Sequence, residues 1–114
     1  MDRNAEFELY QMQAEIAKAL ASPIRLRILN RIGADEVPYA ALLGDLGISK
    51  TNLSQHLAVL RKAGVLSVRR QGVHVRYRLT YPEIKGLCQS MREILGKHLA
   101  AAGRQGRLLM RHVG

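Results

Sequence analysis

The chain has 114 residues, 18 Lys and Arg against 9 Asp and Glu, a formal net charge of +9 at pH 7 and a single cysteine, Cys88. Its length fits one domain, and one cysteine excludes an intrachain disulfide and any thiolate metal cluster within one chain. A small, strongly basic protein indicates nucleic acid or an anionic membrane surface as its partner. No apolar run approaches the roughly 20 residues of a membrane span, and the N-terminal segment is acidic where a secretory signal would be basic. We therefore expect a cytoplasmic protein with no membrane partner.

Three helices are predicted before the most basic part of the chain, over residues 7–21, 23–33 and 39–46. Ser22 is suited to N-cap the second helix, and Pro23 fits its first position because the missing N–H costs nothing there. Gly33 ends this helix, and Gly47 makes the turn from the third helix into the fourth. Residues 39–64 are therefore predicted to form a helix-turn-helix.

The fourth helix, after Ser49 as N-cap and before Gly64, is the element around which the chain is organised. Its leucines have the spacing of one buried face: Leu53, Leu57 and Leu60. At about 100° per residue, the face opposite these leucines comprises Thr51, Ser54, Gln55, Ala58 and Lys62, with Lys50 and Arg61 on its border. The side chains of this face are mostly short and uncharged. Such side chains can hydrogen-bond base edges and allow close approach, as a helix in the major groove requires.

After Gly64 the apolar period changes from helical to alternating, which predicts a β-hairpin with Gln71 and Gly72 as its tight turn. Its second strand alternates apolar with basic residues, the apolar set being Val73, Val75, Tyr77 and Leu79. One apolar face should pack on the body and the tip should be basic. The predicted fold is mainly α with a small β-hairpin: a winged helix-turn-helix with five helices, the hairpin lying between the fourth and the fifth.

No acidic residue lies between Asp45 and Glu83, so this surface should carry a strongly positive potential. Double-stranded DNA is the partner that this pattern favours. Winged-helix domains also serve as protein–protein modules, and an arginine-rich hairpin face is often only solvated. We interpret His56, at the edge of the leucine face, as a half-buried, hydrogen-bonded residue rather than a base reader. His74, near the wing tip, is interpreted as a phosphate or minor-groove contact.

The last predicted helix runs to about residue 102, and Thr80 and Glu83 have the spacing of a capping box at its start. Its apolar stripe is larger than one small domain can cover: Ile84, Leu87, Cys88, Met91, Ile94, Leu95, His98 and Leu99. We expect a homodimer that forms through the first and last helices. Residues 1–103 should form the DNA-binding and dimerisation domain, and residues 104–114 a basic mobile tail with an extra phosphate contact.

Two segments resemble the ArsR/SmtB family of bacterial winged-helix repressors: ALASPIRLRILNRI from Ala19, and LGISKTNLSQHLAVLRKAGVLSVRRQGVHVRYRL from Leu46. The resemblance implies a homodimer that binds a palindromic operator and is released by a metal ion or another chemical signal. By position, four residues match the family's groove-reading set: Lys50, Thr51, Ser54 and Gln55. The whole expected DNA-binding set, wing included, is Ser49, Lys50, Thr51, Ser54, Gln55, Arg61, Lys62, Arg69, Arg70, His74 and Arg76.

The metal-binding positions of that family hold other residues in this chain. Where the family has a Cys-x-Cys pattern at the start of the third helix, this chain has Val37-Pro38-Tyr39-Ala40. The positions of the family's second site hold Tyr81, Glu83, Ile94 and Lys97, of which only Glu83 could bind a metal. We therefore expect no inherited metal site and no cofactor.

Cys88 and His98 are the remaining candidates for a sensor. They lie ten residues apart on one helix, about 15 Å, which is too far to share an ion. In an antiparallel helix pair crossing near Glu93, Cys88 would approach His98 of the partner subunit. Three interpretations stay open: a thiol or metal sensor at this pair, a redox role for Cys88 alone, and plain packing in the dimer seam.

The leading prediction is a sequence-specific, double-stranded DNA-binding repressor that binds its operator as a homodimer and responds to an unknown effector. The alternative is an architectural or nucleoid-type DNA-binding protein without an effector, which the basic tail and the unfilled metal positions favour. An enzyme is not expected, because no Gly-rich phosphate loop, paired carboxylates or Ser/His/Asp arrangement stands out. RNA binding is not expected either, because the sequence lacks the interleaved aromatic residues that stack on unpaired bases.

Overall fold

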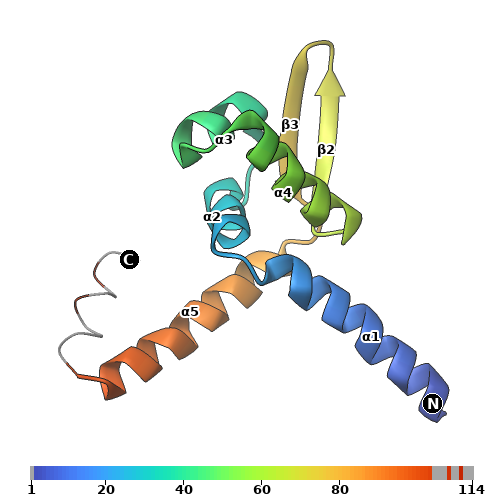
Figure 1. Cartoon of the computed structure of the whole chain (residues 1–114), viewed down its shortest axis with the longest axis vertical. Helices are drawn as coiled ribbons and strands as arrows, with labels where there is room; N and C mark the ends of the chain where they lie inside the picture. The colour runs from blue at the N-terminus through green and yellow to red at the C-terminus, as the bar shows by residue number, and fades with distance from the viewer. Residues whose placement is uncertain (1, 104–107, 109–110, 112–114) are drawn as a thin grey trace. The chain divides into compact units, whose positions relative to one another are not determined.

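The computed structural model describes residues 2–103, 108 and 111 of the chain, which divides into two compact units between Pro82 and Glu83. Figure 1 shows the helices and the hairpin along the chain. The elements in chain order are α1 (Arg3–Leu20), α2 (Pro23–Ile32), β1 (Val37–Pro38), α3 (Tyr39–Leu46), α4 (Lys50–Lys62), β2 (Leu66–Gln71), β3 (His74–Leu79) and α5 (Glu83–Ala101). The predicted winged helix-turn-helix with five helices is confirmed. In the described part of the chain, no helix is both long and apolar enough to cross a bilayer.

Side-chain caps fix where the first two helices begin. Asp2 accepts a hydrogen bond from the backbone N–H of Ala5 at 2.7 Å, so α1 begins at Arg3, four residues before the predicted start. The prediction was wrong there because it followed the apolar periodicity and overlooked the N-cap aspartate. Ser22 caps α2 as predicted, accepting from the N–H of Arg25 at 3.3 Å, and Pro23 occupies the first turn.

The sheet has three strands rather than the predicted two. β1, a strand of two residues between the predicted second and third helices, pairs antiparallel with β3, giving the order β1-β3-β2. Val37, which pairs with Tyr77, is buried like its partner. A strand this short has no periodicity of its own, so sequence patterns cannot reveal it.

The hairpin turn lies one residue later than predicted. Gln71 pairs with His74, so Gly72 and Val73 form the turn, and Gly72 has a φ of +59°. Glycine at the first central position is the pattern of a type II′ turn. Val73 was expected on the apolar face of the wing, but it lies at the tip and is 92% exposed.

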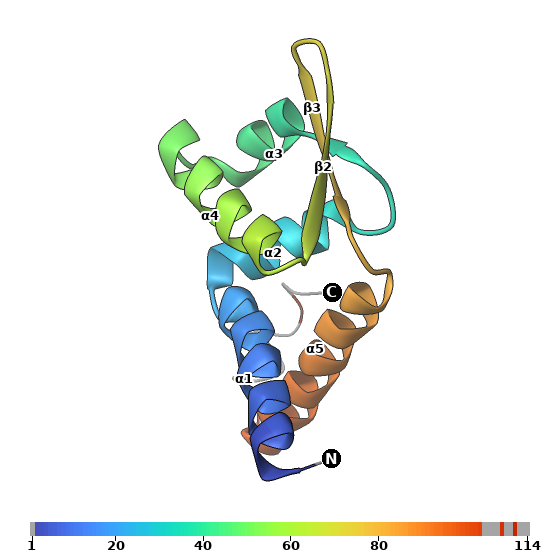
Figure 2. The ribbon, with the colours of Figure 1, turned by 90° about the vertical axis from the view of Figure 1, so that its right-hand side faces the viewer.

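A core of aliphatic side chains holds the first unit together. Its fully buried members come from α2, α3, α4 and the entry to β2: Ile28, Leu42, Leu53, Leu57, Leu60 and Val65. Each such side chain contributes about 1.5–3 kcal/mol through burial. Figure 2 shows α2 at the base of the hairpin and α3 and α4 beside its lower part, with the β2–β3 tip projecting beyond them.

α5 begins at Glu83, but not with the predicted capping box. The hydroxyl of Thr80 is bonded to that of Ser67 at 2.8 Å, and the Thr80 N–H donates to the carbonyl of Val65, so Thr80 fastens the base of the wing instead. Four large apolar side chains of α5 are exposed in the single chain: Leu87, Met91, Ile94 and Leu95. Several on α1 are exposed too: Phe7, Leu9, Tyr10, Met12 and Ile16.

Candidate nucleic-acid interface

α4 presents the polar face that the helical wheel predicted. Leu53, Leu57 and Leu60 point into the core, each at most 1% exposed. The opposite face is exposed along its whole length: Lys50, Thr51, Ser54, Gln55, Ala58, Arg61 and Lys62. Ser49 caps the helix by accepting from the N–H of Asn52 at 3.1 Å. The buried leucines therefore fix the rotation of α4 so that short hydrogen-bonding side chains face solvent.

Tyr39 lies beside this face, although no sequence pattern indicated a role for it. Its hydroxyl is 3.4 Å from the Oγ of Ser54 and 3.5 Å from the carbonyl oxygen of Lys50. Since Tyr39 opens α3, these contacts couple the start of α3 to the first turns of α4. The rotamer of the exposed Ser54 hydroxyl is thereby restricted.

Replacing Tyr39 with Phe is expected to weaken discrimination among DNA sequences without unfolding the protein. The substitution removes only a hydroxyl, and a neutral hydrogen bond of this kind contributes about 0.5–1.5 kcal/mol. We expect the affinity ratio between a cognate and a random duplex to fall by up to about tenfold. Fluorescence anisotropy on both duplexes measures this ratio, and an unchanged ratio would show that Tyr39 does not position Ser54.

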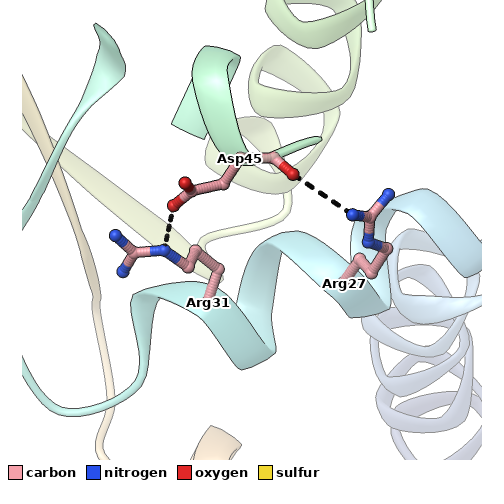
Figure 3. A network of polar contacts seen from close by, with 3 residues as sticks. All are labelled: Arg27, Arg31 and Asp45. Atoms are coloured by element: carbon pink, nitrogen blue, oxygen red, sulfur yellow. Dashed lines mark hydrogen bonds and ion pairs between the residues drawn. The ribbon is translucent and has the colours of Figure 1, made fainter. Parts of the chain in front are cut away.

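Arginines of α2 fix the end of α3, which leads into α4 (Figure 3). Arg27 donates to the backbone carbonyls of Asp45 and Leu46 at 3.2 and 3.3 Å, and Arg31 pairs with the Asp45 carboxylate. The last carbonyls of a helix lack intrahelical partners, so guanidinium groups there satisfy them. Arg27 and Arg31 therefore hold the end of α3 in the position from which the chain turns into α4.

A third arginine of α2 contacts α4 directly. Arg25 donates from Nε to the Ala19 carbonyl at 2.6 Å and from Nη2 to the Lys18 carbonyl at 3.2 Å, at the end of α1. Its Nη1 lies 3.3 Å from Nδ1 of His56. Arginine can only donate, so Nδ1 accepts in this contact. His56 is half-buried and hydrogen-bonded, as interpreted from the sequence.

The cations of the wing divide between the two faces of the hairpin. Arg69 pairs in register with Arg76, and both lie on the face opposite Val68 and Tyr77, which pack toward the core. Arg70 follows Arg69 along the strand and so points to the other face, near the tip. His74 at the tip is exposed.

An acidic residue from outside the wing contacts its arginine face. Glu36, immediately before β1, accepts two hydrogen bonds from Arg69, from Nε at 3.0 Å and from Nη2 at 2.7 Å. The hydrogen bond from Arg69, with the positive charges of Arg69, Arg76 and Arg78, lowers the pKa of Glu36 below its usual value, although partial desolvation opposes the shift. The absence of acids between residues 45 and 83 had predicted an unbroken positive surface, but β1 brings this carboxylate to the wing.

The two candidate sensor residues are not brought together within one chain. Cys88 is buried, whereas His98 is exposed on the same helix. Burial raises the pKa of the Cys88 thiol, and the nearby charge of Arg92 opposes this only in part. Among the described residues, no group of three or more His, Cys, Asp or Glu is arranged to hold a metal ion.

The residues at the family's thiolate positions do not fit a metal either. Val37 is a buried strand residue, and the hydroxyl of Tyr39 is engaged with α4. Neither side chain supplies a ligand that a soft metal prefers. These positions therefore serve packing and the placement of α4.

Comparison with known proteins agrees with this geometry. Residues 20–69 match the family model described as a helix-turn-helix domain. The HTH-type transcriptional regulator Rv0081 of Mycobacterium tuberculosis is 40% identical over 93 residues, covering 81% of this chain and 82% of that protein. A solution structure from Mycobacterium bovis, the homodimeric winged helix-turn-helix DNA-binding domain of Mb0332, described as a possible ArsR-family regulator, has a TM-score of 0.77 and 28% identity over 91% of this chain and 94% of that one.

The chain belongs to the ArsR family of helix-turn-helix transcriptional regulators. The crystal structure of Rv0081 has a TM-score of 0.76 and 38% identity, covering 84% of this chain and 97% of that one. HlyU of Vibrio cholerae, a transcriptional activator, is 31% identical over 81% of this chain and 91% of its own length. ArsR-family proteins are transcriptional regulators and not enzymes, in agreement with the sequence prediction.

Proposed function

We propose that this ArsR-family protein binds double-stranded DNA in a sequence-specific manner and represses transcription from a palindromic operator, as a homodimer in the cytoplasm. The observation that carries the proposal is the exposed polar face of α4 beside the projecting basic hairpin. A helix with hydroxyl and amide side chains on its outer face fits the major groove, and a hairpin with guanidinium groups fits the backbone next to it.

The proposed contacts divide into two classes. Thr51, Ser54 and Gln55 read base edges, since a hydroxyl can donate or accept and a glutamine amide can bind adenine with two hydrogen bonds. Lys50 matches a groove-reading position of the family and belongs with them. The remaining residues contact the backbone: Ser49, Arg61, Lys62, Arg70, His74 and Arg76. These contacts set affinity and register but carry no sequence information directly. Arg69 also belongs to the proposed interface, although Glu36 engages it in the free protein.

Two copies of the chain would bind one operator. The exposed apolar residues of α5 and α1 need a partner surface in water, and the Mb0332 domain is described as homodimeric. A twofold axis would place two α4 helices in successive major grooves, about 34 Å apart. The operator should therefore be an inverted repeat whose half-sites lie one helical turn apart.

Nuclease footprinting on the DNA upstream of the protein's own gene tests this proposal. A short protected inverted repeat, with RNA unable to compete, is the expected result. Diffuse protection at any sequence would instead favour the alternative of an architectural DNA-binding protein. A reporter gene under the protected promoter should be more active when the protein is absent; lower activity would indicate activation.

We propose that a small chemical signal releases the operator and that Cys88 serves as a packing residue rather than the sensor. The raised pKa of the buried thiol supports this choice, because thiolate is the reactive form of cysteine. An intersubunit pair of Cys88 with His98 of the partner subunit remains the competing proposal, with a thiol-reactive species or a metal as its signal.

Replacing Cys88 with Ser is expected to leave operator affinity unchanged within about twofold, with or without diamide or zinc. Serine has a similar size, and the substitution removes only the sulfur chemistry. Gel-shift titration of both proteins under each condition provides the comparison. Loss of wild-type binding in diamide or zinc, with retention by the Ser variant, would instead establish Cys88 as the sensor.

The proposed basic tail, residues 104–114, lies largely outside the described residues. We propose that it adds phosphate contacts beyond the domain formed by residues 1–103. Its arginines at positions 104, 107 and 111 support this role. A chain ending at residue 103 should show a shallower salt dependence of DNA affinity with the same sequence preference.

A further inference from the structure

Glu36 is positioned against cations that the proposed function requires for DNA. Its carboxylate takes two parallel hydrogen bonds from Arg69, through the Nε–H and one Nη2–H of the guanidinium. That edge of arginine also binds phosphate in a two-pronged manner. The carboxylate therefore occupies the donors that a DNA phosphate would use.

We propose that Glu36 acts as an internal substitute for phosphate. It withholds Arg69 from DNA and so limits the affinity of the wing for DNA of any sequence. The inference rests on the proposed function and deepens it, because it assigns to one acidic residue the control of backbone affinity. The wild-type protein thereby dissociates more readily from operator and from other DNA alike.

The charges around Glu36 support this role. Arg69 and Arg76 lie directly opposite each other on the hairpin, an arrangement of like charges that is unfavourable without a counterion. Glu36 supplies that counterion in the free protein, whereas phosphates could supply it in the complex.

A glutamate with a lowered pKa keeps its charge throughout the neutral range, so the competition between Glu36 and phosphate operates at every pH near 7. It would be lost only as the pH falls through the lowered pKa.

A purely structural role explains the ion pair less well. The adjacent strand β1 is already held to β3 by the pairs Val37–Tyr77 and Pro38–Arg76, and Val37 is buried. The Arg69 side chain is 51% exposed, and ion pairs exposed to this degree contribute little to folding. The wing therefore has its anchor without the Glu36 carboxylate.

The test compares Glu36→Gln with a matched control, Asp35→Asn, across a series of salt concentrations. Both substitutions remove one negative charge from the same loop, but the exposed Asp35 does not contact Arg69. Releasing one arginine per subunit should add about two phosphate contacts per dimer and steepen the slope of log K against log [salt] by about 1.8. On random duplex DNA at 100 mM salt, Glu36→Gln should bind on the order of tenfold more tightly, and Asp35→Asn clearly less so.

Arg69→Gln completes the design. Combined with Glu36→Gln, it should abolish the gain in affinity and slope that Glu36→Gln produces on its own. The inference is overturned if Glu36→Gln behaves like Asp35→Asn, binds more weakly than wild type, or keeps its gain without Arg69. Wild-type protein that shows no salt-dependent duplex binding would instead overturn the proposed function itself. Thermal unfolding of each variant confirms that the folded proteins are compared.

Discussion

An Ile94→Asp protein is expected to be a folded monomer whose operator affinity is about a hundredfold to ten-thousandfold below that of the wild type. Ile94 on α5 is 66% exposed in the single chain, so an aspartate there creates no buried charge before assembly. In the proposed dimer, however, it would place a carboxylate in an apolar seam, which is strongly unfavourable. Loss of the second DNA-binding unit removes the high effective concentration that a linked pair of sites provides.

Gln89→Asp is the matched control for this prediction. Gln89 is an exposed polar residue of the same helix, outside its apolar stripe, and the substitution introduces the same charge. Sedimentation equilibrium should show a dimer for the wild type and the control and a monomer for Ile94→Asp. A dimeric Ile94→Asp protein with full operator affinity would exclude the α5 stripe as the subunit interface.

Replacing Gln55 with Ala should relax sequence preference, whereas replacing Arg70 with Ala should weaken binding to every sequence. A two-pronged amide contact to a base provides about 1–3 kcal/mol of discrimination, and the dimer would lose two such contacts. The affinity for the operator should therefore fall by one to several orders of magnitude, while that for random DNA stays nearly constant. Arg70→Ala should reduce both affinities by a similar factor and make the salt slope shallower by about 1.8 per dimer.

Titration of each variant with operator and random duplexes at two salt concentrations separates these effects. Lys85→Ala, which removes an exposed cation outside the proposed contact set, is the control for Arg70→Ala. Equal losses on both duplexes for Gln55→Ala would contradict its assignment as a base reader. A loss confined to the operator for Arg70→Ala would show that the wing contributes to sequence recognition.

The parts of the fold that sequence predicted well are those with repeated patterns. Three leucines at helical spacing fix the orientation of α4, and the alternation ending in Tyr77 and Leu79 identifies the buried face of β3. Features set by one or two residues were missed or misplaced. The Asp2 cap moved the start of α1, and the position of Gly72 in its turn shifted the hairpin tip by one residue.

Within the candidate interface, the exposed residues of α4 could be predicted because a helical wheel depends only on local spacing. The partners of those residues could not, since they come from distant parts of the chain. The contact of Tyr39 with Ser54 and the ion pair of Glu36 with Arg69 depend on how α3 and β1 pack in three dimensions. The same reason applies to Arg25, whose contact with His56 joins α2 to α4.

The salt dependence of duplex DNA binding by the wild-type protein tests the central claim most directly. With six or more phosphate contacts in the dimer, affinity for the protein's own upstream DNA should fall by roughly a thousandfold or more between 50 and 200 mM salt. Sequence preference for an inverted repeat should persist over this range. A folded protein whose affinity for duplex DNA does not change with ionic strength would contradict the assignment of α4 and the wing as a DNA-binding surface.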